Sequence, residues 1–174
     1  MKATGMILNE LATVLPQIAG DDGAVALERA LVRANRIFTS GAGRSGLMLA
    51  AFTNRLMHLG LSAYRVGDVT TPAIHTGDLL IVASRSGCTA GPLNNARVAA
   101  ASGAEVVAVT ADPLSPLAQC ATTTLVIPTS PSAQPMGTLF EQVLLLTLDA
   151  VVLDLMRELQ ETDESMRERH ATME

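Results

Sequence analysis

The segment IFTSGAGRSG, residues 37–46, joins a short apolar run to a glycine-rich loop and then to a helical pattern. Residues 37–39 are typical of a buried strand, and residues 45–59 carry helical apolar spacing that stops at Gly60. The loop matches the pattern G-x-G-x-x-G, which alone is a weak signal. Its glycines let the backbone turn tightly, and the free N–H groups of the following helix attract an anion. The segment therefore predicts a strand–loop–helix unit with a candidate anion site at the loop.

The same alternation continues on both sides of this unit. Further strands are predicted at residues 62–66, 79–83, 106–110 and 125–127, and further helices at residues 6–19, 24–35, 90–102, 139–160 and 164–171. Strands that alternate with helices indicate a parallel sheet covered on both faces, and right-handed crossovers favour doubly wound forms. We therefore expect a three-layer, doubly wound α/β fold with five parallel strands in the flavodoxin-like order 2-1-3-4-5.

In that order, the switch point lies between the first and third strands, and ligands bind there at the carboxyl ends. The glycine loop follows the first strand, and the third strand leads into a second loop, Ser84-Arg85-Ser86-Gly87-Cys88-Thr89. The hydroxyls of Ser84, Ser86 and Thr89 can all donate to one phosphate, and Arg85 either adds charge or points to solvent. Alternatively, Thr89 caps the next helix and the serines are ordinary turn residues. Because both loops meet at one predicted switch point, an anion site is favoured.

Composition excludes several classes of protein. The chain has 174 residues, 48% of them hydrophobic, and a formal net charge of -5, which suits one folded domain better than a disordered chain. It has four aromatic residues and no Lys/Arg tract, so nucleic-acid binding is not expected. No apolar window indicates a membrane span, and the N-terminal stretch predicts an amphipathic helix and not a signal peptide. Two cysteines predict neither a disulfide framework nor a metal cluster, and they fit a reducing cytoplasm.

Dinucleotide binding is an alternative use of the glycine loop. It requires an acidic residue about 20 positions after the glycines to hold the ribose, and Asp68 fits that place. However, the chain leaves no room for a separate substrate domain, and the hydroxyl-rich second loop suits one phosphate monoester better than a pyrophosphate. The residues that follow the second strand, Thr70, Thr71 and Pro72, are expected either to contact a ligand or a neighbouring subunit, or to form an ordinary turn.

Six separated blocks of the chain resemble a known family. They are Gly41-Ala42-Gly43-Arg44-Ser45-Gly46, Arg55-Leu56-Met57-His58-Leu59-Gly60, Val66-Gly67-Asp68-Val69-Thr70-Thr71-Pro72, Gly77-Asp78-Leu79-Leu80-Ile81, Met136-Gly137-Thr138-Leu139-Phe140-Glu141 and Arg169-His170-Ala171. In this order they resemble the sugar isomerase (SIS) domain of the 6-phospho-3-hexuloisomerases, from about residue 5 to the C-terminus. The resemblance implies one SIS domain over residues 1–174, in which the helices within 6–35 and 138–171 contribute to oligomerisation.

The resemblance also implies an activity. Such enzymes are metal-independent, use no cofactor and interconvert D-arabino-hex-3-ulose 6-phosphate and D-fructose 6-phosphate. They act in the cytoplasm, after hexulose-phosphate synthase in the ribulose monophosphate pathway of formaldehyde assimilation, and they are typically homotetramers without nucleic-acid or membrane partners. A non-catalytic phosphosugar-binding SIS module and an isomerase for another sugar phosphate remain as alternatives.

Residue by residue, the resemblance implies a sugar-phosphate pocket. The implied substrate-binding residues are Gly43, Arg44 and Ser45 of the first loop and Ser84, Ser86 and Thr89 of the second. Arg85 is added as a candidate contact. The second loop departs from the family pattern, because Arg85 stands where the family usually has glycine and Cys88 where it usually has glutamate. The phosphate-binding hydroxyls are retained, so the departure bears on the exact substrate and on activity more than on phosphate binding.

Moving a carbonyl from C3 to C2 requires that a proton be removed from C2 and one returned to C3 through a cis-enediol. One carboxylate on one face of the sugar can perform both transfers. The resemblance implies that Glu141 is this base. The residues alone leave an alternative, because Thr138-x-x-Glu141 also matches a capping box. The only lysine, Lys2, lies at a chain end, so a Schiff-base mechanism is not expected.

The three histidines lie in different contexts. His58 comes thirteen residues after Ser45 on one predicted helix, roughly 20 Å from the phosphate end, and is expected at a helix C-terminus or at an interface. His75 belongs to a turn and is expected in solvent. His170, in the terminal segment, is a candidate catalytic or substrate-contacting residue that reaches across a subunit interface.

Overall fold

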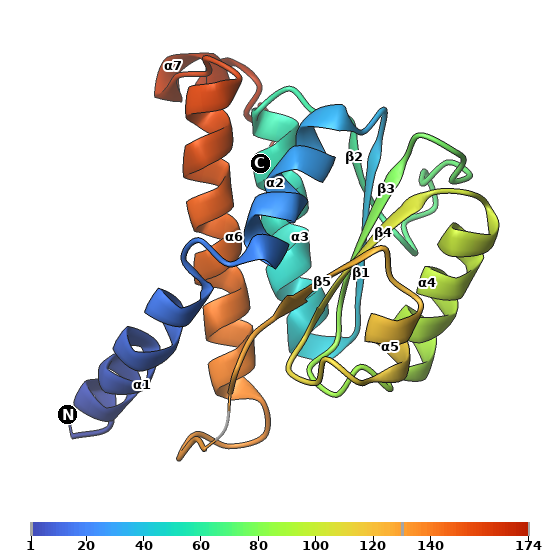
Figure 1. Ribbon diagram of the computed structural model, residues 1–174. Helices are drawn as coiled ribbons and strands as arrows, with labels where there is room; N and C mark the ends of the chain where they lie inside the picture. Colours follow the sequence, from blue (N-terminus) through green and yellow to red (C-terminus); the bar gives the residue numbers. More distant parts are fainter. Residues whose placement is uncertain (1, 130, 174) are drawn as a thin grey trace.

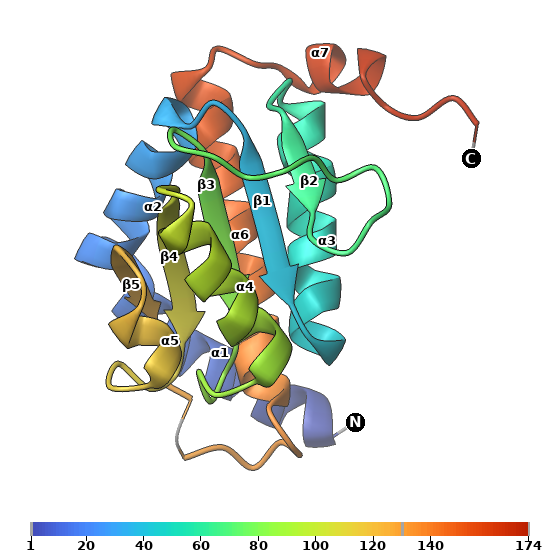
Figure 2. The same cartoon turned by 90° about the vertical axis from the view of Figure 1, so that its right-hand side faces the viewer.

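A computed structural model describes residues 2–129 and 131–173 of the chain. Its elements are α1 (Lys2–Ile18), α2 (Asp22–Arg33), β1 (Ile37–Gly41), α3 (Gly43–His58), β2 (Ala63–Arg65), β3 (Leu79–Ala83), α4 (Ala90–Ala101), β4 (Glu105–Thr110), α5 (Pro116–Gln119), β5 (Thr123–Val126), α6 (Thr138–Glu158) and α7 (Asp163–Glu168). Figures 1 and 2 show helices on both faces of a central sheet. Within the described ranges, no helix is long and apolar enough to cross a membrane.

The five strands form one parallel sheet in the order β2-β1-β3-β4-β5, which confirms the predicted fold class and topology. β3 lies at the centre and is buried along its whole length, as its continuous apolar sequence predicts. In the register between β1 and β3, Gly41 lies opposite Ala83. The glycine loop and the hydroxyl loop therefore leave the sheet side by side.

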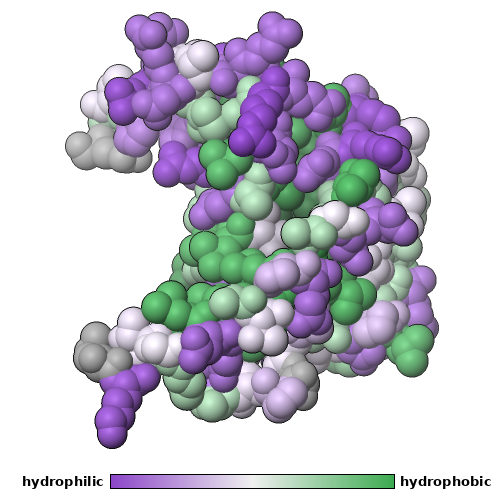
Figure 3. Space-filling view, turned by 60° about the vertical axis from the view of Figure 1, so that its left-hand side comes forward, coloured by the Kyte–Doolittle hydropathy of each residue, from purple (hydrophilic) through white to green (hydrophobic). Residues whose placement is uncertain are grey.

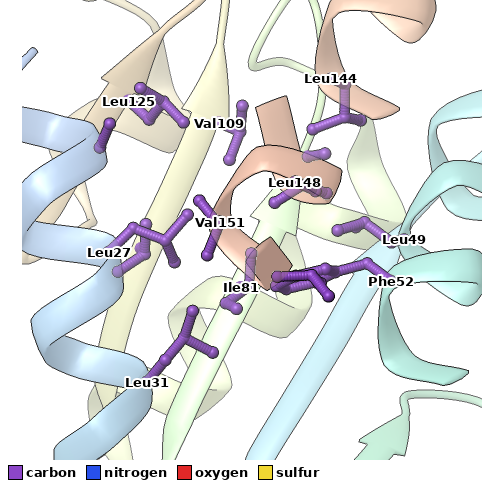
Figure 4. Close-up of a cluster of buried hydrophobic side chains, with 14 of the residues drawn as sticks. Leu27, Leu31, Leu49, Phe52, Ile81, Val109, Leu125, Leu144, Leu148 and Val151 are labelled. Atoms are coloured by element: carbon purple, nitrogen blue, oxygen red, sulfur yellow. The ribbon is translucent and has the colours of Figure 1, made fainter. Parts of the chain in front are cut away.

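Alternate residues of β3 face the two helical layers, as the period of a strand requires. Leu79 and Ile81 belong to the core under α2, α3 and α6, whereas Leu80 and Val82 belong to the core under α4 and α5. Figure 4 shows the first of these cores, where side chains from α2, α3 and α6 meet over Ile81. The two cores together cover both faces of the sheet that carries the loops.

Helix α1 extends away from this three-layer body and packs along α6 (Figure 1). Its buried residues, Val14 and Ile18, lie one turn apart on one face of the helix. The sequence predicted a helix from residue 6, but α1 begins at Lys2. The difference arises because residues 2–5 offer no apolar periodicity, although alanine and lysine favour helix.

The short helix α5 was not predicted. Ser115 caps it by accepting a hydrogen bond from the Ala118 amide, and Pro116 occupies its first turn. Four residues are too few to show a helical period, so the apolar pattern gives no signal there. The other predicted elements are present, with boundaries that differ by at most three residues.

Candidate active site

A cavity of about 500 Å³ opens at the carboxyl ends of β1 and β3, where the starts of α3, α4 and α6 converge. It is lined by Ala42, Ser45, Ala83, Ser84, Arg85, Ser86, Thr89, Met136, Gly137 and Glu141. In Figure 2 the strands run downward, and these loops gather at their lower ends. The cavity lies at the predicted switch point, and its size falls within the range of small-molecule sites.

The hydroxyl loop forms one wall of this cavity. Ser84 Oγ lies 3.0 Å from Thr89 Oγ1, and Ser86 Oγ accepts a hydrogen bond from the Cys88 amide at 3.3 Å. Thr89 is the N-cap residue of α4, but within the described chain its side chain makes no capping hydrogen bond. Thr89 therefore holds the N-cap position without supplying the side-chain hydrogen bond of a cap. Its hydroxyl contacts that of Ser84 instead, and Ser86 lines the same cavity.

The glycine loop forms the facing wall. Ala42 precedes the first turn of α3, whose leading N–H groups have no intrahelical acceptor, and Ser45 of that turn is buried against the cavity. Helix starts of this kind attract phosphate groups. Two helix N-termini, those of α3 and α4, therefore point towards the same space as the three hydroxyls.

The glycine loop turns so tightly that the backbones of Gly41 and Gly46 touch, which is possible because neither residue has a side chain. A Cβ atom at Gly46 would lie only 2.6 Å from the Gly41 carbonyl oxygen. We expect Gly46→Ala to destabilise the protein by about 1–3 kcal/mol through overpacking, which lowers Tm by several degrees. Thermal unfolding measures this, with Gly91→Ala in α4 as the control, since a Cβ there has nothing within 4 Å. Equal Tm values for the two variants would show that the loop relaxes without cost.

Glu141 lies in the first turn of α6 and lines the cavity, with its side chain 14% exposed. Its Oε2 accepts a hydrogen bond from Arg44 Nε, forming an ion pair between α6 and α3. The capping-box alternative is wrong, because Gly137 is the N-cap residue and the Thr138 hydroxyl donates to the Pro135 carbonyl at 2.7 Å. The carboxylate is therefore available to the cavity.

Of the remaining predicted binding residues, Arg85 lines the cavity, whereas Gly43 and Arg44 lie outside its lining. Arg44 reaches the cavity through its ion pair with Glu141. Arg85 lines the cavity and packs against Gly137, where a Cβ would lie 2.9 Å from Arg85 Cδ. Cys88 is an exposed free thiol outside the lining.

Sequence reasoning did not single out Met136 and Gly137 as site residues. They line the cavity beside Arg85, at the end of the loop that leads into α6. The block of residues 136–141 that supports the family resemblance was the available signal.

Asp68, Thr70 and Thr71 lie outside this site. They line a separate groove of about 350 Å³ between α3 and β2, together with Asn54. Asp68 is half exposed, and its Oδ1 lies 3.9 Å from Arg65 Nη1. Asp68 lines this groove and not the cavity at the glycine loop, so the described residues give no support to a ribose contact there.

Two histidines meet at the far end of α3 from Ser45. The rings of His58 and His170 stack with centroids 5.2 Å apart, and Arg169 donates to the His58 carbonyl at 2.9 Å. His58 is 3% exposed, so it is buried beneath the terminal segment. His170 therefore does not reach the cavity of its own chain. His75 stands in a turn, where its amide donates to Asp78 Oδ2.

The terminal segment is fastened by Glu161. Arg169 donates to both of its carboxylate oxygens, at 2.8 and 2.9 Å. The hydrogen bonds from Arg169 and then Ser165 lower the pKa of Glu161 from 4.5 to about 2. Because the folded-state pKa is depressed, the contact stabilises the fold above pH 4.5 and is lost as the pH falls towards 2.

We expect Glu161 to stay ionised at about pH 3 in a ¹³C NMR titration of side-chain carboxyls, well below the range of ordinary carboxyl groups. In Arg169→Gln, its midpoint should move up towards 4.5, because the main cause of the shift is removed. Arg167→Gln, which breaks only the exposed pair with Asp163, is the matched control. A wild-type midpoint near 4.5 would show that Arg169 does not pair with Glu161 in solution.

Comparisons with known proteins agree with this architecture. A family model for the SIS domain matches residues 30–153. A 3-hexulose-6-phosphate isomerase of Mycobacterium gastri is 41% identical over 97% of this chain and 88% of its own length. The enzyme of the same name from Bacillus subtilis is 40% identical over 97% of this chain and 95% of its own. A solved structure from Methanococcus jannaschii, from which that molecular function was inferred, superposes with a TM-score of 0.92 at 30% identity and full coverage of both chains.

The fold and the site define a class of protein: doubly wound α/β domains with a hydroxyl-lined cavity at the switch point. The chain belongs to the SIS domain family and, within it, to the family of the 3-hexulose-6-phosphate isomerases. In the part of the chain that the structure describes, no group of three or more His, Cys, Asp or Glu side chains is placed to hold a metal ion.

Proposed function

We propose that this protein is an isomerase that interconverts D-arabino-hex-3-ulose 6-phosphate and D-fructose 6-phosphate. One observation carries the proposal: the Glu141 carboxylate shares a single cavity with Ser84, Ser86 and Thr89. A phosphate cradle alone suits any binding module, but a carboxylate beside it supplies the proton-transfer group that an isomerase needs. The names of the relatives from Mycobacterium gastri and Bacillus subtilis support the same substrate pair.

The cavity accounts for both ends of the substrate. Ser84, Ser86 and Thr89 donate hydroxyl hydrogen bonds to the phosphate, and the free N–H groups at the starts of α3 and α4 add further donors. The carbon chain then extends across the cavity towards Glu141. Fixing the phosphate in this way sets the distance between the reacting carbons and the carboxylate, which is how positioning lowers a barrier.

Glu141 performs the chemistry. Its carboxylate removes the proton from C2 of the 3-ketose, the electrons of that C–H bond form the C2=C3 bond, and the C3 carbonyl oxygen takes up a proton from water to complete the cis-enediol. The carboxyl group then returns its proton to C3, where the C2=C3 electrons form the new C–H bond, while the C2 hydroxyl gives up its proton to water and becomes the carbonyl. Arg44 orients the carboxylate through its ion pair and so fixes the oxygen that faces the sugar.

An uncovered apolar surface supports an oligomeric assembly. A cavity of about 600 Å³ lies between α1, α2 and α6, and its lining includes Leu15, Ile18, Leu146 and Val151. Figure 3 shows hydrophobic residues gathered in this hollow between the two ends of the chain. Among the described residues, the buried Thr147 hydroxyl of this lining has no hydrogen-bond partner. A second copy of the chain would cover the surface, as in the homotetramer that the family resemblance implies.

In such an assembly His170 becomes a candidate for the neighbour's cavity, because it lies too far from its own. The exposed free thiol of Cys88 fits a reducing compartment, so we place the enzyme in the cytoplasm. There it acts on the product of hexulose-phosphate synthase, in the ribulose monophosphate pathway of formaldehyde assimilation.

A coupled assay tests the proposal. Purified protein is given D-arabino-hex-3-ulose 6-phosphate, and fructose 6-phosphate is detected through glucose-6-phosphate isomerase and an NADP-dependent dehydrogenase. Turnover at an enzyme-like rate supports the isomerase. Binding of fructose 6-phosphate in a thermal-shift measurement without any turnover would instead identify a non-catalytic phosphosugar-binding module.

A further inference from the structure

Glu10 lies on α1 on a stripe that is otherwise apolar. Val14 and Ile18 follow it at intervals of one turn and are both buried against the body of the protein. Glu10 itself is only partly buried, so the groups that its carboxylate contacts decide how it is held. Its partners therefore show what this position is for.

Within residues 2–129 and 131–173, the hydrogen bonds that Glu10 accepts come from one short segment. Ser132 Oγ donates at 2.8 Å, the Ala133 amide at 2.8 Å and Gln134 Nε2 at 3.0 Å. The Ser132 hydroxyl also accepts from the Gln134 amide at 3.0 Å, which closes the segment into a turn. The donors from Gln134, Ala133 and Ser132, in that order of size, lower the pKa of Glu10. Three convergent bonds to one ionised carboxylate fix both the place and the shape of the segment.

This segment leads directly into the cavity. Met136 and Gly137 follow it and line the cavity, where Gly137 lies against Arg85 of the hydroxyl loop. Met136 is 95% exposed and has a φ of 60°, a conformation that non-glycine residues rarely adopt. Its own side chain has little contact to hold it there, so the constraint must come from the residues on either side.

The segment also sets the beginning of α6. The Thr138 hydroxyl and amide both donate to the Pro135 carbonyl, at 2.7 and 3.1 Å. Glu141 follows three residues later, and its amide donates to the Gly137 carbonyl at 3.2 Å. A continuous chain of contacts thus joins Glu10 on α1 to the proposed base.

We propose that Glu10 is a positioning residue of the active site: it fixes residues 132–134, and through them the cavity wall at Met136 and Gly137 and the first turn of α6. The inference rests on the proposed isomerase function. It gives α1 a role beyond packing, because the helix that lies outside the three-layer body controls the geometry around the substrate.

Kinetics test the proposal. We expect Glu10→Ala and Gln134→Ala each to lower kcat/KM about tenfold, the effect of losing charge-assisted hydrogen bonds that align the site. Glu10→Gln, which keeps the size of the side chain, should lower it in the same direction. The control is Gln17→Ala on the same helix, because Gln17 donates only to the Thr13 carbonyl within α1. A Glu10→Ala enzyme with wild-type kcat and KM would overturn the proposal.

The double variant Glu10→Ala/Gln134→Ala separates positioning from general loss of stability. If both residues act through the same contact, the fold-loss in kcat/KM of the double variant equals that of the less active single variant. It does not reach the product of the two single losses. A loss equal to the product would mean that the two residues act independently, which contradicts the inference.

Amide hydrogen exchange of residues 131–138 distinguishes failure of this inference from failure of the proposed function. It needs no turnover. Exchange of this segment should rise in Glu10→Ala and Gln134→Ala and stay unchanged in Gln17→Ala. Unchanged exchange in Glu10→Ala overturns the inference even in an active isomerase, whereas raised exchange in a protein without turnover leaves the positioning intact and rejects only the reaction.

Discussion

Glu141→Gln is expected to reduce kcat by about 10²–10⁴-fold, the contribution typical of a positioned general base. The amide occupies nearly the same volume and keeps an oxygen that can accept from Arg44, so the first turn of α6 should remain in place. It cannot accept a proton from C2 of the sugar at neutral pH. Fructose 6-phosphate should still bind, because the phosphate contacts lie on the other wall of the cavity.

The matched control is Glu158→Gln at the opposite end of the same helix, where the side chain is exposed. That variant should keep wild-type turnover. Steady-state kinetics and calorimetric binding of fructose 6-phosphate separate the two effects. Near-normal kcat in Glu141→Gln would remove Glu141 from the chemistry and reduce its role to the ion pair with Arg44.

The double variant Ser84→Ala/Thr89→Val is expected to raise KM for the sugar phosphate by about 100-fold or more. Each hydroxyl that donates to a charged group contributes about 1.5–3 kcal/mol, and every 1.4 kcal/mol corresponds to a factor of ten. The two hydroxyls lie 3.0 Å apart and interact with each other. Removing both therefore leaves no unpaired partner, and stability should change little.

Ser102→Ala is the control for this variant, because Ser102 follows the far end of α4 and its hydroxyl donates only to the Val98 carbonyl. Inorganic phosphate as a competitive inhibitor gives an independent reading, since its inhibition constant should rise with KM. If KM is unchanged while kcat falls, the hydroxyl loop serves the reaction and not phosphate binding.

Much of the fold could be predicted, because its signals are local. The apolar run of β3 and the glycines that follow α3 and α4, Gly60 and Gly103, indicate where strands and helices alternate. That alternation favours the doubly wound sheet order that the structure has. The place of the site followed from the same order, because the switch point is a property of topology. Helix α5 was not predicted, because a single helical turn shows no apolar period in the sequence.

The finer arrangement of the site depends on contacts that no local pattern encodes. Thr138 and Glu141 match a capping box in sequence, yet the carboxylate turns to Arg44, which lies 97 residues earlier. The contact between Glu10 and Gln134 spans 124 residues, and no local sequence pattern in either segment predicts it. The stacking of His58 and His170 is equally non-local. Residue types and spacing identify the chemical groups available, whereas packing decides which of them meet.

The central claim is that Glu141 moves a proton between C2 and C3 of a phosphorylated sugar. Its most direct test is ¹H NMR of fructose 6-phosphate incubated with the protein in D₂O. Removal of the C3 proton and its return through a carboxyl group that exchanges with solvent replaces that hydrogen by deuterium. We predict that the C3–H signal of fructose 6-phosphate disappears with the wild-type protein and persists with Glu141→Gln at the same concentration. Persistence of the signal with the wild-type protein, or its loss at an equal rate with the variant, would contradict the account.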